Sequence, residues 1–167
     1  MKMDIRRMRA DEAKDYWELR LEALQNNPEA FASSYEEAVE RQNPLEGVAT
    51  NLERAVTFGA YEGDRLIGVI TFVRGSGLKT KHKGDLFAVY VTPDYRGKGV
   101  GKALLKEAID HVKGLSELVK INISVASVNK TAKQLYHSFG FKTYAHEEKA
   151  LYVNGEFLDE DHMVLFL

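Results

Sequence analysis

The chain of 167 residues contains no cysteine. This absence excludes disulfide bonds, a zinc–thiolate centre and a catalytic thiol. A basic excess is also missing, because 23 lysines and arginines stand against 25 aspartates and glutamates, for a formal net charge of −2. A general nucleic-acid binder usually carries a strong positive excess, so we expect no nucleic-acid partner. The five histidines are scattered without a metal-binding pair, and we expect no metal.

Long apolar runs are missing as well. No segment approaches the roughly 18 consecutive apolar residues that a membrane helix needs. Residues 1–9 carry charge but lead into no apolar stretch of the kind found in signal peptides. These absences predict a cytoplasmic protein with no membrane partner. The length and the hydrophobic fraction of 44% predict one domain, residues 1–167, with a core of its own.

Hydrophobic periodicity predicts a mixture of strands and helices. Strands are expected at residues 3–8, 55–61, 66–73, 83–91, 118–125, 141–145 (extending towards 151) and 162–167. Helices are expected at residues 11–25, 35–41, 100–113 and 129–139, with a loop at 43–50 and a helical turn up to 54. Short turns join the strands between 55 and 91, which predicts an antiparallel meander. The strand–helix–strand order from 83 to 125 predicts one parallel pair.

A glycine-rich segment links the strand at 83–91 to the helix that follows. It reads Arg96-Gly97-Lys98-Gly99-Val100-Gly101-Lys102. Glycine allows a tight turn and close approach of a ligand to the backbone. At a helix N-terminus, unpaired N–H groups and the positive end of the helix dipole point at one place. The segment therefore predicts a site for an anion, most naturally a phosphate or pyrophosphate.

Two common phosphate-binding loops do not fit this segment. A Walker A loop needs a glycine where Arg96 stands and a serine or threonine where Ala103 stands. A dinucleotide-binding fingerprint needs a third glycine where Lys102 stands, and it occurs early in a βαβ unit rather than after a meander. Both readings are excluded by residues and by context.

The segment resembles the signature of the GCN5-related N-acetyltransferase (GNAT) family, Gln/Arg-x-x-Gly-x-Gly/Ala between a strand and a helix. The match falls on Arg96, Gly99 and Gly101. A second segment, from Asn129 to Phe141, resembles the family's second cofactor-contacting region, in which an asparagine precedes a helix bearing Leu-Tyr and then Gly-Phe. The resemblance implies a mixed α/β (α+β) fold. Its mostly antiparallel sheet would have six to seven strands and about four flanking helices, and strands 4 and 5 would be parallel and splayed.

The resemblance also implies acetyl-coenzyme A as co-substrate. Backbone N–H groups of the glycine loop would hold the pyrophosphate, and the pantetheine arm would lie between the splayed strands. A strand N–H near Val89 to Val91 would polarise the thioester carbonyl. The residues expected to contact the cofactor are Val89, Tyr90, Val91, Arg96, Gly97, Lys98, Gly99, Val100, Gly101, Lys102, Asn129 and Ala132.

Acetyl transfer to an amine requires the neutral amine and, after attack, a proton for the leaving thiolate. The resemblance implies Tyr136 as the proton donor, although its spacing from Leu135 and Phe139 is equally typical of a core position. Asp85 is the expected base. Glu36 and Glu37 are alternatives, and each of these carboxylates is also typical of a solvated surface. Without a cysteine or a Ser-His pattern, direct transfer in a ternary complex is expected.

The acceptor is expected to be a primary amine of a small molecule or of a protein. Acidic residues in residues 28–40 favour a cationic small molecule such as a polyamine; they are Glu29, Glu36, Glu37 and Glu40. The alternative function is a catalytically silent module that binds acyl-coenzyme A as a sensor or regulator. The resemblance leaves open whether the chain forms a homodimer.

Overall fold

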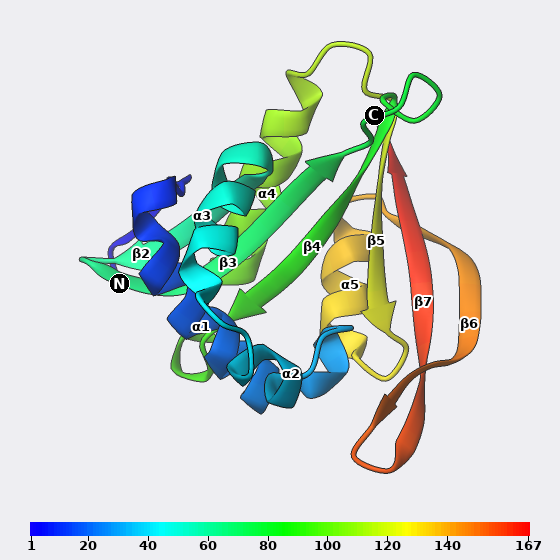
Figure 1. Cartoon of the computed structure of the whole chain (residues 1–167). Coiled ribbons are helices and arrows are strands. Elements are labelled where there is room, and N and C mark those ends of the chain that lie inside the picture. The colour runs from blue at the N-terminus through cyan, green and yellow to red at the C-terminus, as the bar shows by residue number, and fades with distance from the viewer.

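A seven-stranded mixed sheet forms the centre of the computed structural model, which describes all 167 residues (Figure 1). The strand order is β1-β2-β3-β4-β5-β7-β6. The strands are β1 (Met3–Arg7), β2 (Val56–Glu62), β3 (Arg65–Arg74), β4 (Lys83–Val91), β5 (Lys120–Ala126), β6 (Lys142–Val153) and β7 (Glu156–Phe166). Neighbouring strands run antiparallel except β4 and β5, which are parallel. The predicted mixed sheet with one parallel pair is confirmed.

The parallel pair holds together over only part of its length. Lys83 to Leu86 of β4 pair with Lys120 to Ile123 of β5, and the pairing stops there. Beyond Leu86 the two strands diverge, as Figure 1 shows. The predicted splay is therefore confirmed, and it opens towards the glycine-rich segment at the end of β4.

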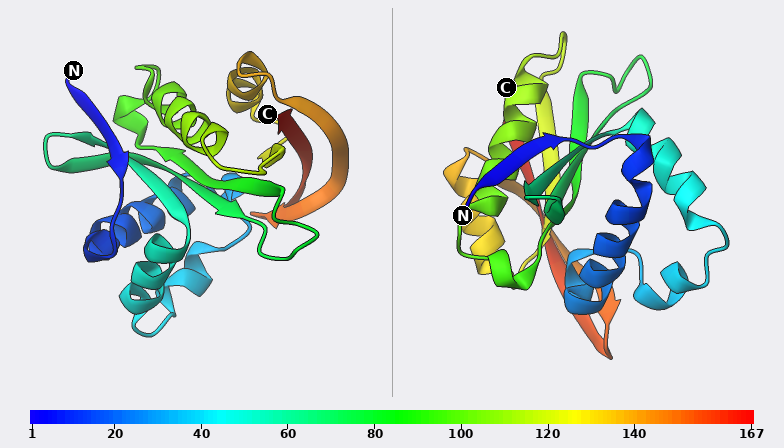
Figure 2. Two further views of the ribbon diagram at one scale, coloured as in Figure 1. Left: turned by 90° about the horizontal axis from the view of Figure 1, so that it is seen from above. Right: turned by 90° about the vertical axis from the view of Figure 1, so that its left-hand side faces the viewer.

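Helices cover both faces of the sheet (Figure 2). One face carries α1 (Ala13–Asn26), α2 (Tyr35–Val39) and α3 (Pro44–Arg54), and the other carries α4 (Val100–Lys113) and α5 (Lys130–Ser138). Two separate hydrophobic cores result, one under each helix layer. Short 3-10 turns lie at Ala10–Glu12, Pro28–Ala30 and Pro93–Tyr95. None of the helices combines the length and the apolar composition that crossing a membrane requires.

The loop predicted at residues 43–50 is wrong, because α3 begins at Pro44 and continues to Arg54. Pro44 occupies the first turn, where its missing N–H costs nothing and its fixed φ suits a helix. Val48 and Leu52 are one turn apart and both are buried in the core shared with α1. With Leu45 and Ala49 these residues recur at helical spacing, so the sequence carries the helix signal that the loop prediction overlooked.

The last two strands are longer than the sequence suggests. They form a hairpin of 12 and 11 residues around a turn at Asn154-Gly155. Irregularities interrupt the β6–β7 register between Thr143 and Ala145 and between Glu147 and Leu151. Because such irregularities shift side chains between faces, they remove the two-residue alternation on which strand prediction depends.

Candidate active site

A β-bulge in β4 marks the point where the sheet opens. Val69 of β3 pairs with Tyr90 and Thr71 pairs with Phe87, so β4 has one residue more than β3 between these pairs. Ala88, within this bulge, has a φ of 55°, a left-handed conformation that is costly for a residue with a Cβ. The bulge follows directly after the last residue of β4 that pairs with β5. It therefore leaves a strand edge that is free for hydrogen bonds to a ligand.

The three predicted β4 residues lie along this open edge. Val89 and Val91 pack against the core beneath α4 and α5, whereas Tyr90 is buried in the core beneath α1 to α3. Their backbone lies beyond the segment of β4 that pairs with β5. The structure thus brings this edge and the glycine loop together at one end of the splay.

The glycine loop has the geometry that an anion site requires. Gly97 and Gly99 have φ values of 74° and 82°, which a residue with a side chain rarely adopts. Gly99 is also the N-cap of α4, and the first intrahelical hydrogen bond runs from Ala103 N to Gly99 O over 3.0 Å. No side chain caps this helix. The N–H groups of its first three residues, Val100 to Lys102, are therefore available to an anion.

Gly101 has a different role from the other two glycines. A Cβ placed on it would lie 3.7 Å from Leu135 Cδ2 and 3.9 Å from Val91 Cγ2, which is ordinary van der Waals contact. A methyl group therefore fits at this position, but a larger side chain would meet α5 and the end of β4. Lys98 and Lys102 are exposed and add positive charge beside the loop.

Arg96 is oriented by the protein itself. Its Nε donates to the Val91 carbonyl over 2.9 Å, and its NH2 group donates to Asn27 Oδ1 over 2.6 Å. Its guanidinium carbon also lies 5.5 Å from the Tyr90 ring centre. These contacts tie the loop to the end of β4 and to the end of α1. In this structure the Arg96 side chain is engaged with Val91 and Asn27, which leaves the backbone N–H groups as the groups that an anion could reach.

Glu22 on α1 makes polar contacts with β4 that the sequence analysis did not predict. Its Oε2 accepts hydrogen bonds from the Tyr90 hydroxyl over 2.7 Å and from the Thr92 hydroxyl over 3.0 Å. Asn26, one turn later, donates from Nδ2 to the Tyr90 hydroxyl over 3.2 Å. The sequence feature that could have predicted these contacts is the spacing of Glu22 and Asn26, which lie four residues apart and therefore on one face of α1. These contacts fix α1 against the open edge of β4.

The second predicted motif forms α5, with Asn129 as its N-cap. Asn129 Oδ1 accepts a hydrogen bond from Ala132 N over 3.1 Å, and this bond caps the first turn of α5. Tyr136, two turns on, is 5% exposed, and its ring centre lies 6.1 Å from that of Phe141. Burial raises the pKa of the Tyr136 hydroxyl to about 12. A phenol with this pKa keeps its proton at neutral pH and can act as a donor.

Asp85 lies one residue before β4 and β5 separate, opposite Asn122 of β5 and Val73 of β3. Burial raises the pKa of its carboxyl, although Lys83, Asn122 and Lys120 oppose the shift. A raised carboxyl pKa suits a base that works near neutral pH. Asp85 therefore stands at the closed end of the splay, and its role as a base stays a prediction.

The other proposed bases lie elsewhere. Glu37 lies in the first turn of α2, where its backbone N–H donates to the Oγ of the N-cap residue Ser34, and Ser34 Oγ donates to Glu37 Oε1. Glu36 is an exposed residue in the same first turn. Their positions are explained by helix capping and by the α2 dipole.

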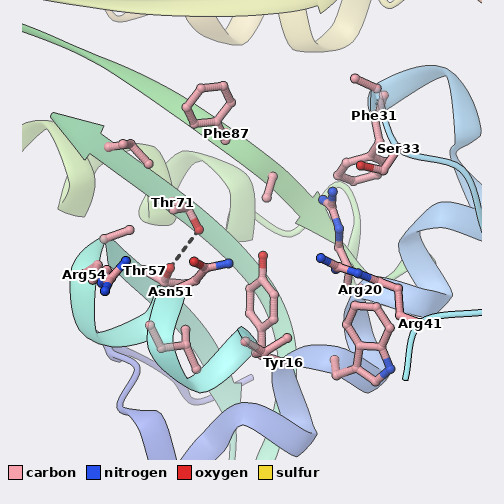
Figure 3. Close-up of a pocket in the computed structure, with 18 residues that line it drawn as sticks. Tyr16, Arg20, Phe31, Ser33, Arg41, Asn51, Arg54, Thr57, Thr71 and Phe87 are labelled. Carbon is pink, nitrogen blue, oxygen red and sulfur yellow. Dashed lines mark hydrogen bonds between the residues drawn. The ribbon is translucent and has the colours of Figure 1, made fainter. Parts of the chain in front are cut away.

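A cavity of about 570 Å³ lies on the face of the sheet that α1 and α3 cover (Figure 3). Phe87 and Ala88 at the β4 bulge line one side of it, and α1, α3 and residues 30–33 line the others. The four acidic residues of 28–40 that favoured a cationic acceptor are not part of its lining; they are Glu29, Glu36, Glu37 and Glu40. Its charged lining residues are Arg20, Arg41 and Arg54, which the sequence reading did not single out.

Comparisons with known proteins bear on the family and the fold. The profile of the acetyltransferase (GNAT) family matches residues 13–141, which include the glycine loop and α5. A spermidine N(1)-acetyltransferase of Vibrio cholerae is 26% identical over 147 residues, covering 85% of this chain and 83% of the relative.

Solved structures share the fold over nearly the whole chain. A GNAT-family acetyltransferase from Streptococcus pneumoniae superposes with a TM-score of 0.88 at 21% identity, covering 99% of this chain and 100% of that one. A Salmonella typhimurium protein described as an acetyltransferase, solved with its cofactor acetyl-CoA, has a TM-score of 0.84 at 22% identity and covers 100% and 95% of the two chains. The family profile spans most of the sequence, and the chain therefore belongs to the acetyltransferase (GNAT) family.

Proposed function

We propose that this chain transfers the acetyl group of acetyl-coenzyme A to a primary amine, by direct transfer within one domain that spans residues 1–167. The observation that carries the proposal is the opening of the sheet beyond Leu86. This opening lies between the uncapped N-terminus of α4 on one face of the sheet and the cavity on the other face. A donor and an acceptor can reach the same strand edge from opposite faces.

The residues at this opening fit coenzyme A. Two positive-φ glycines and three free N–H groups suit its pyrophosphate, and the β4 edge from Phe87 to Val91 offers backbone groups to the amides of pantetheine. When bound, acetyl-coenzyme A supplies an acyl group activated as a thioester. A backbone N–H near Val89 to Val91 would stabilise negative charge on the reacting oxygen.

Two side chains are proposed to move protons. Asp85, with its raised carboxyl pKa, would accept the proton of the incoming amine, directly or through water. Tyr136, protonated at neutral pH because its pKa is about 12, would donate a proton to the departing sulfur. With no cysteine in the chain, a covalent thioester on a cysteine is excluded.

The proposal is tested by two measurements on the intact chain. Titration calorimetry with coenzyme A measures donor binding, and release of free thiol from acetyl-coenzyme A measures turnover with a panel of amines. We expect coenzyme A binding and thiol release that depends on the amine. Tight binding with no turnover across a broad panel would favour the silent acyl-coenzyme A-binding module and refute the enzyme.

A further inference from the structure

The cavity beneath α1 and α3 has an unusual charge distribution. Three arginines contribute to its lining, one from α1, one after α2 and one at the end of α3: Arg20, Arg41 and Arg54. No aspartate or glutamate contributes to it. Figure 3 shows Arg20 and Arg41 at one end of the cavity and Arg54 at the other.

These arginines have no anionic partner within the protein. None of the three forms an ion pair with a carboxylate. Arg20 is half-buried and its guanidinium carbon lies 4.5 Å from the centre of the Phe31 ring, while that of Arg41 lies 5.9 Å from Trp17. Burial lowers the pKa of Arg20, and the charge of Arg41 acts in the same direction. An unpaired and partly buried cation beside a second cation is costly, and an anion in the cavity would offset that cost.

The rest of the lining is aromatic and small. Tyr16, Trp17, Phe31 and Phe87 contribute rings, and the volume of about 570 Å³ suits a small molecule rather than a folded chain. Phe87 and Ala88 connect this cavity to the β4 bulge and hence to the open strand edge. A molecule held by the arginines therefore lies on the acceptor side of the opening.

We propose that this cavity binds the acceptor, and that Arg20 and Arg41 select a small amine that carries a carboxylate, such as an amino acid with an apolar or aromatic body. This inference rests on the proposed function. The planar guanidinium group of arginine donates paired hydrogen bonds to a carboxylate. A polyamine has no carboxylate to accept them. A polyamine would instead place like charges next to the arginines, so the acceptor differs in class from that named for the Vibrio cholerae relative.

The test uses four amines in the thiol-release assay with the intact chain. Phenylalanine, phenylalaninamide and phenethylamine share a ring and an amine but differ in the carboxylate, and spermidine is the cationic comparison. We expect kcat/KM to be highest for phenylalanine and lowest for spermidine. If spermidine or phenethylamine gives the highest kcat/KM, the inference fails while the proposed function stands. If none of these four amines releases thiol but another amine of the broad panel does, the inference fails while the proposed function stands. If no amine of the broad panel releases thiol, the proposed function itself fails.

Variants of the two arginines separate recognition from general activity. Arg20→Gln and Arg41→Gln should each lower kcat/KM for phenylalanine by about 10- to 100-fold, the usual value of hydrogen bonds to a charged group. Their kcat/KM for phenethylamine should change less than about two-fold, because that amine has no carboxylate to lose. Each comparison is between wild type and variant on one amine, so differences in amine pKa cancel.

Two controls keep this test decisive. Arg7→Gln removes an exposed arginine of β1 that lies outside the cavity and should leave all four amines unaffected. Arg41 is exposed, so its replacement leaves the core intact even if Arg20→Gln lowers stability. Equal loss on phenylalanine and phenethylamine in both arginine variants, or no loss on either, would overturn the proposed selection of a carboxylate.

Discussion

The side chain of Tyr136 is buried, and its hydroxyl group stays protonated. Its raised pKa of about 12 keeps the hydroxyl protonated throughout the range in which the protein would work. Tyr136→Phe should lower kcat by about 100-fold or more, since a positioned general acid typically contributes at least that factor. Coenzyme A affinity, measured by calorimetry, should stay unchanged. Tyr144→Phe, at an exposed tyrosine, is the matched control, and an unchanged kcat in Tyr136→Phe would make Tyr136 a packing residue.

Gly99 and Gly101 support the anion site in different ways. Gly99→Val should weaken coenzyme A binding strongly, because a φ of 82° costs a β-branched residue about 1–2 kcal/mol or shifts the first N–H groups of α4. Gly101→Ala should be tolerated, since its Cβ would make ordinary contacts, whereas Gly101→Leu should separate α4 from α5.

The control for these variants is Gly47→Ala in α3, where a Cβ meets nothing within 4 Å. Thermal denaturation of each variant distinguishes lost binding from unfolding. Wild-type coenzyme A affinity in Gly99→Val would show that the loop does not hold the pyrophosphate.

Single residues with local signatures were predictable from the sequence. The tight turn at the glycine loop follows from short-range chemistry, and Gly97 and Gly99 have the positive φ values that such a turn needs. The orientation of Arg96 was not predictable, because its partner Asn27 becomes a neighbour only when α1 packs on the sheet. The same reason hides Arg20 and Arg41, which come from separate segments and share a cavity only in the folded chain.

At the level of elements, α5 depends on its cap. Asn129→Ala removes the hydrogen bond to Ala132 N and should lower the free energy of unfolding by about 1 kcal/mol, whereas Asn129→Asp should retain most of it. Urea denaturation measures both changes. Because α5 carries Tyr136, turnover should fall in parallel with the loss of the cap. Equal stability of the alanine and aspartate variants would show that the cap contributes nothing.

The bulge in β4 is an element-scale feature that the sequence conceals. Residues 86–91 are apolar enough for a regular buried strand, and Ala88 carries none of the usual signals of a left-handed conformation. The strain is held by the surrounding structure, since β3 pairs on both sides of the bulge. The case of α3 differs, because Pro44 and the helical spacing of Val48 and Leu52 are local signals that could have predicted the helix.

At the scale of the whole molecule, a polar cluster connects α5 to the C-terminal hairpin. Asp161 of β7 lies 2.6 Å from Lys133 Nζ and 2.7 Å from His146 Nδ1, and it is 5% exposed. Hydrogen bonds from Lys133 and His146 hold the pKa of Asp161 well below its usual range. Hydrogen bonds to Asp161 and Asp159 raise the pKa of His146.

The signs of these shifts predict how stability depends on pH. Asp161, with its lowered pKa, stabilises the fold above about pH 4, and this contribution is lost as the pH falls further. His146, with its raised pKa, contributes fully below about pH 6.5 and less as the pH rises through its folded pKa. The destabilisation caused by Asp161→Asn should therefore be largest between about pH 4 and 6.5.

Melting temperatures of wild type and Asp161→Asn between pH 3 and 9 check this prediction. Asp64→Asn, in the exposed turn after β2, is the control and should show no such maximum. A wild-type to Asp161→Asn difference that stays constant across this range would show that the charge of Asp161 does not stabilise the hairpin.

Most of the order of strands and helices, and with it the sheet, could be predicted because most elements carry their own periodicity and the two motifs indicate the family. The exceptions are α3 and the full lengths of β6 and β7. The acceptor cavity could not, since α1, α3, residues 30–33 and β4 all contribute to it. The proposed donor side of the site lies in contiguous motifs, and the proposed acceptor side forms only in the folded chain.

The central claim is direct transfer of an acetyl group to an amine at the opening between β4 and β5. The most direct measurement supplies acetyl-coenzyme A with an isotopically labelled acetyl group and follows the label by mass spectrometry on both the amine and the intact protein. We predict that the label appears on the nitrogen of the amine, that the mass of the protein stays unchanged, and that Gly99→Val abolishes the transfer. Release of thiol without an acetylated amine, or stable label on the protein during turnover, would contradict the account.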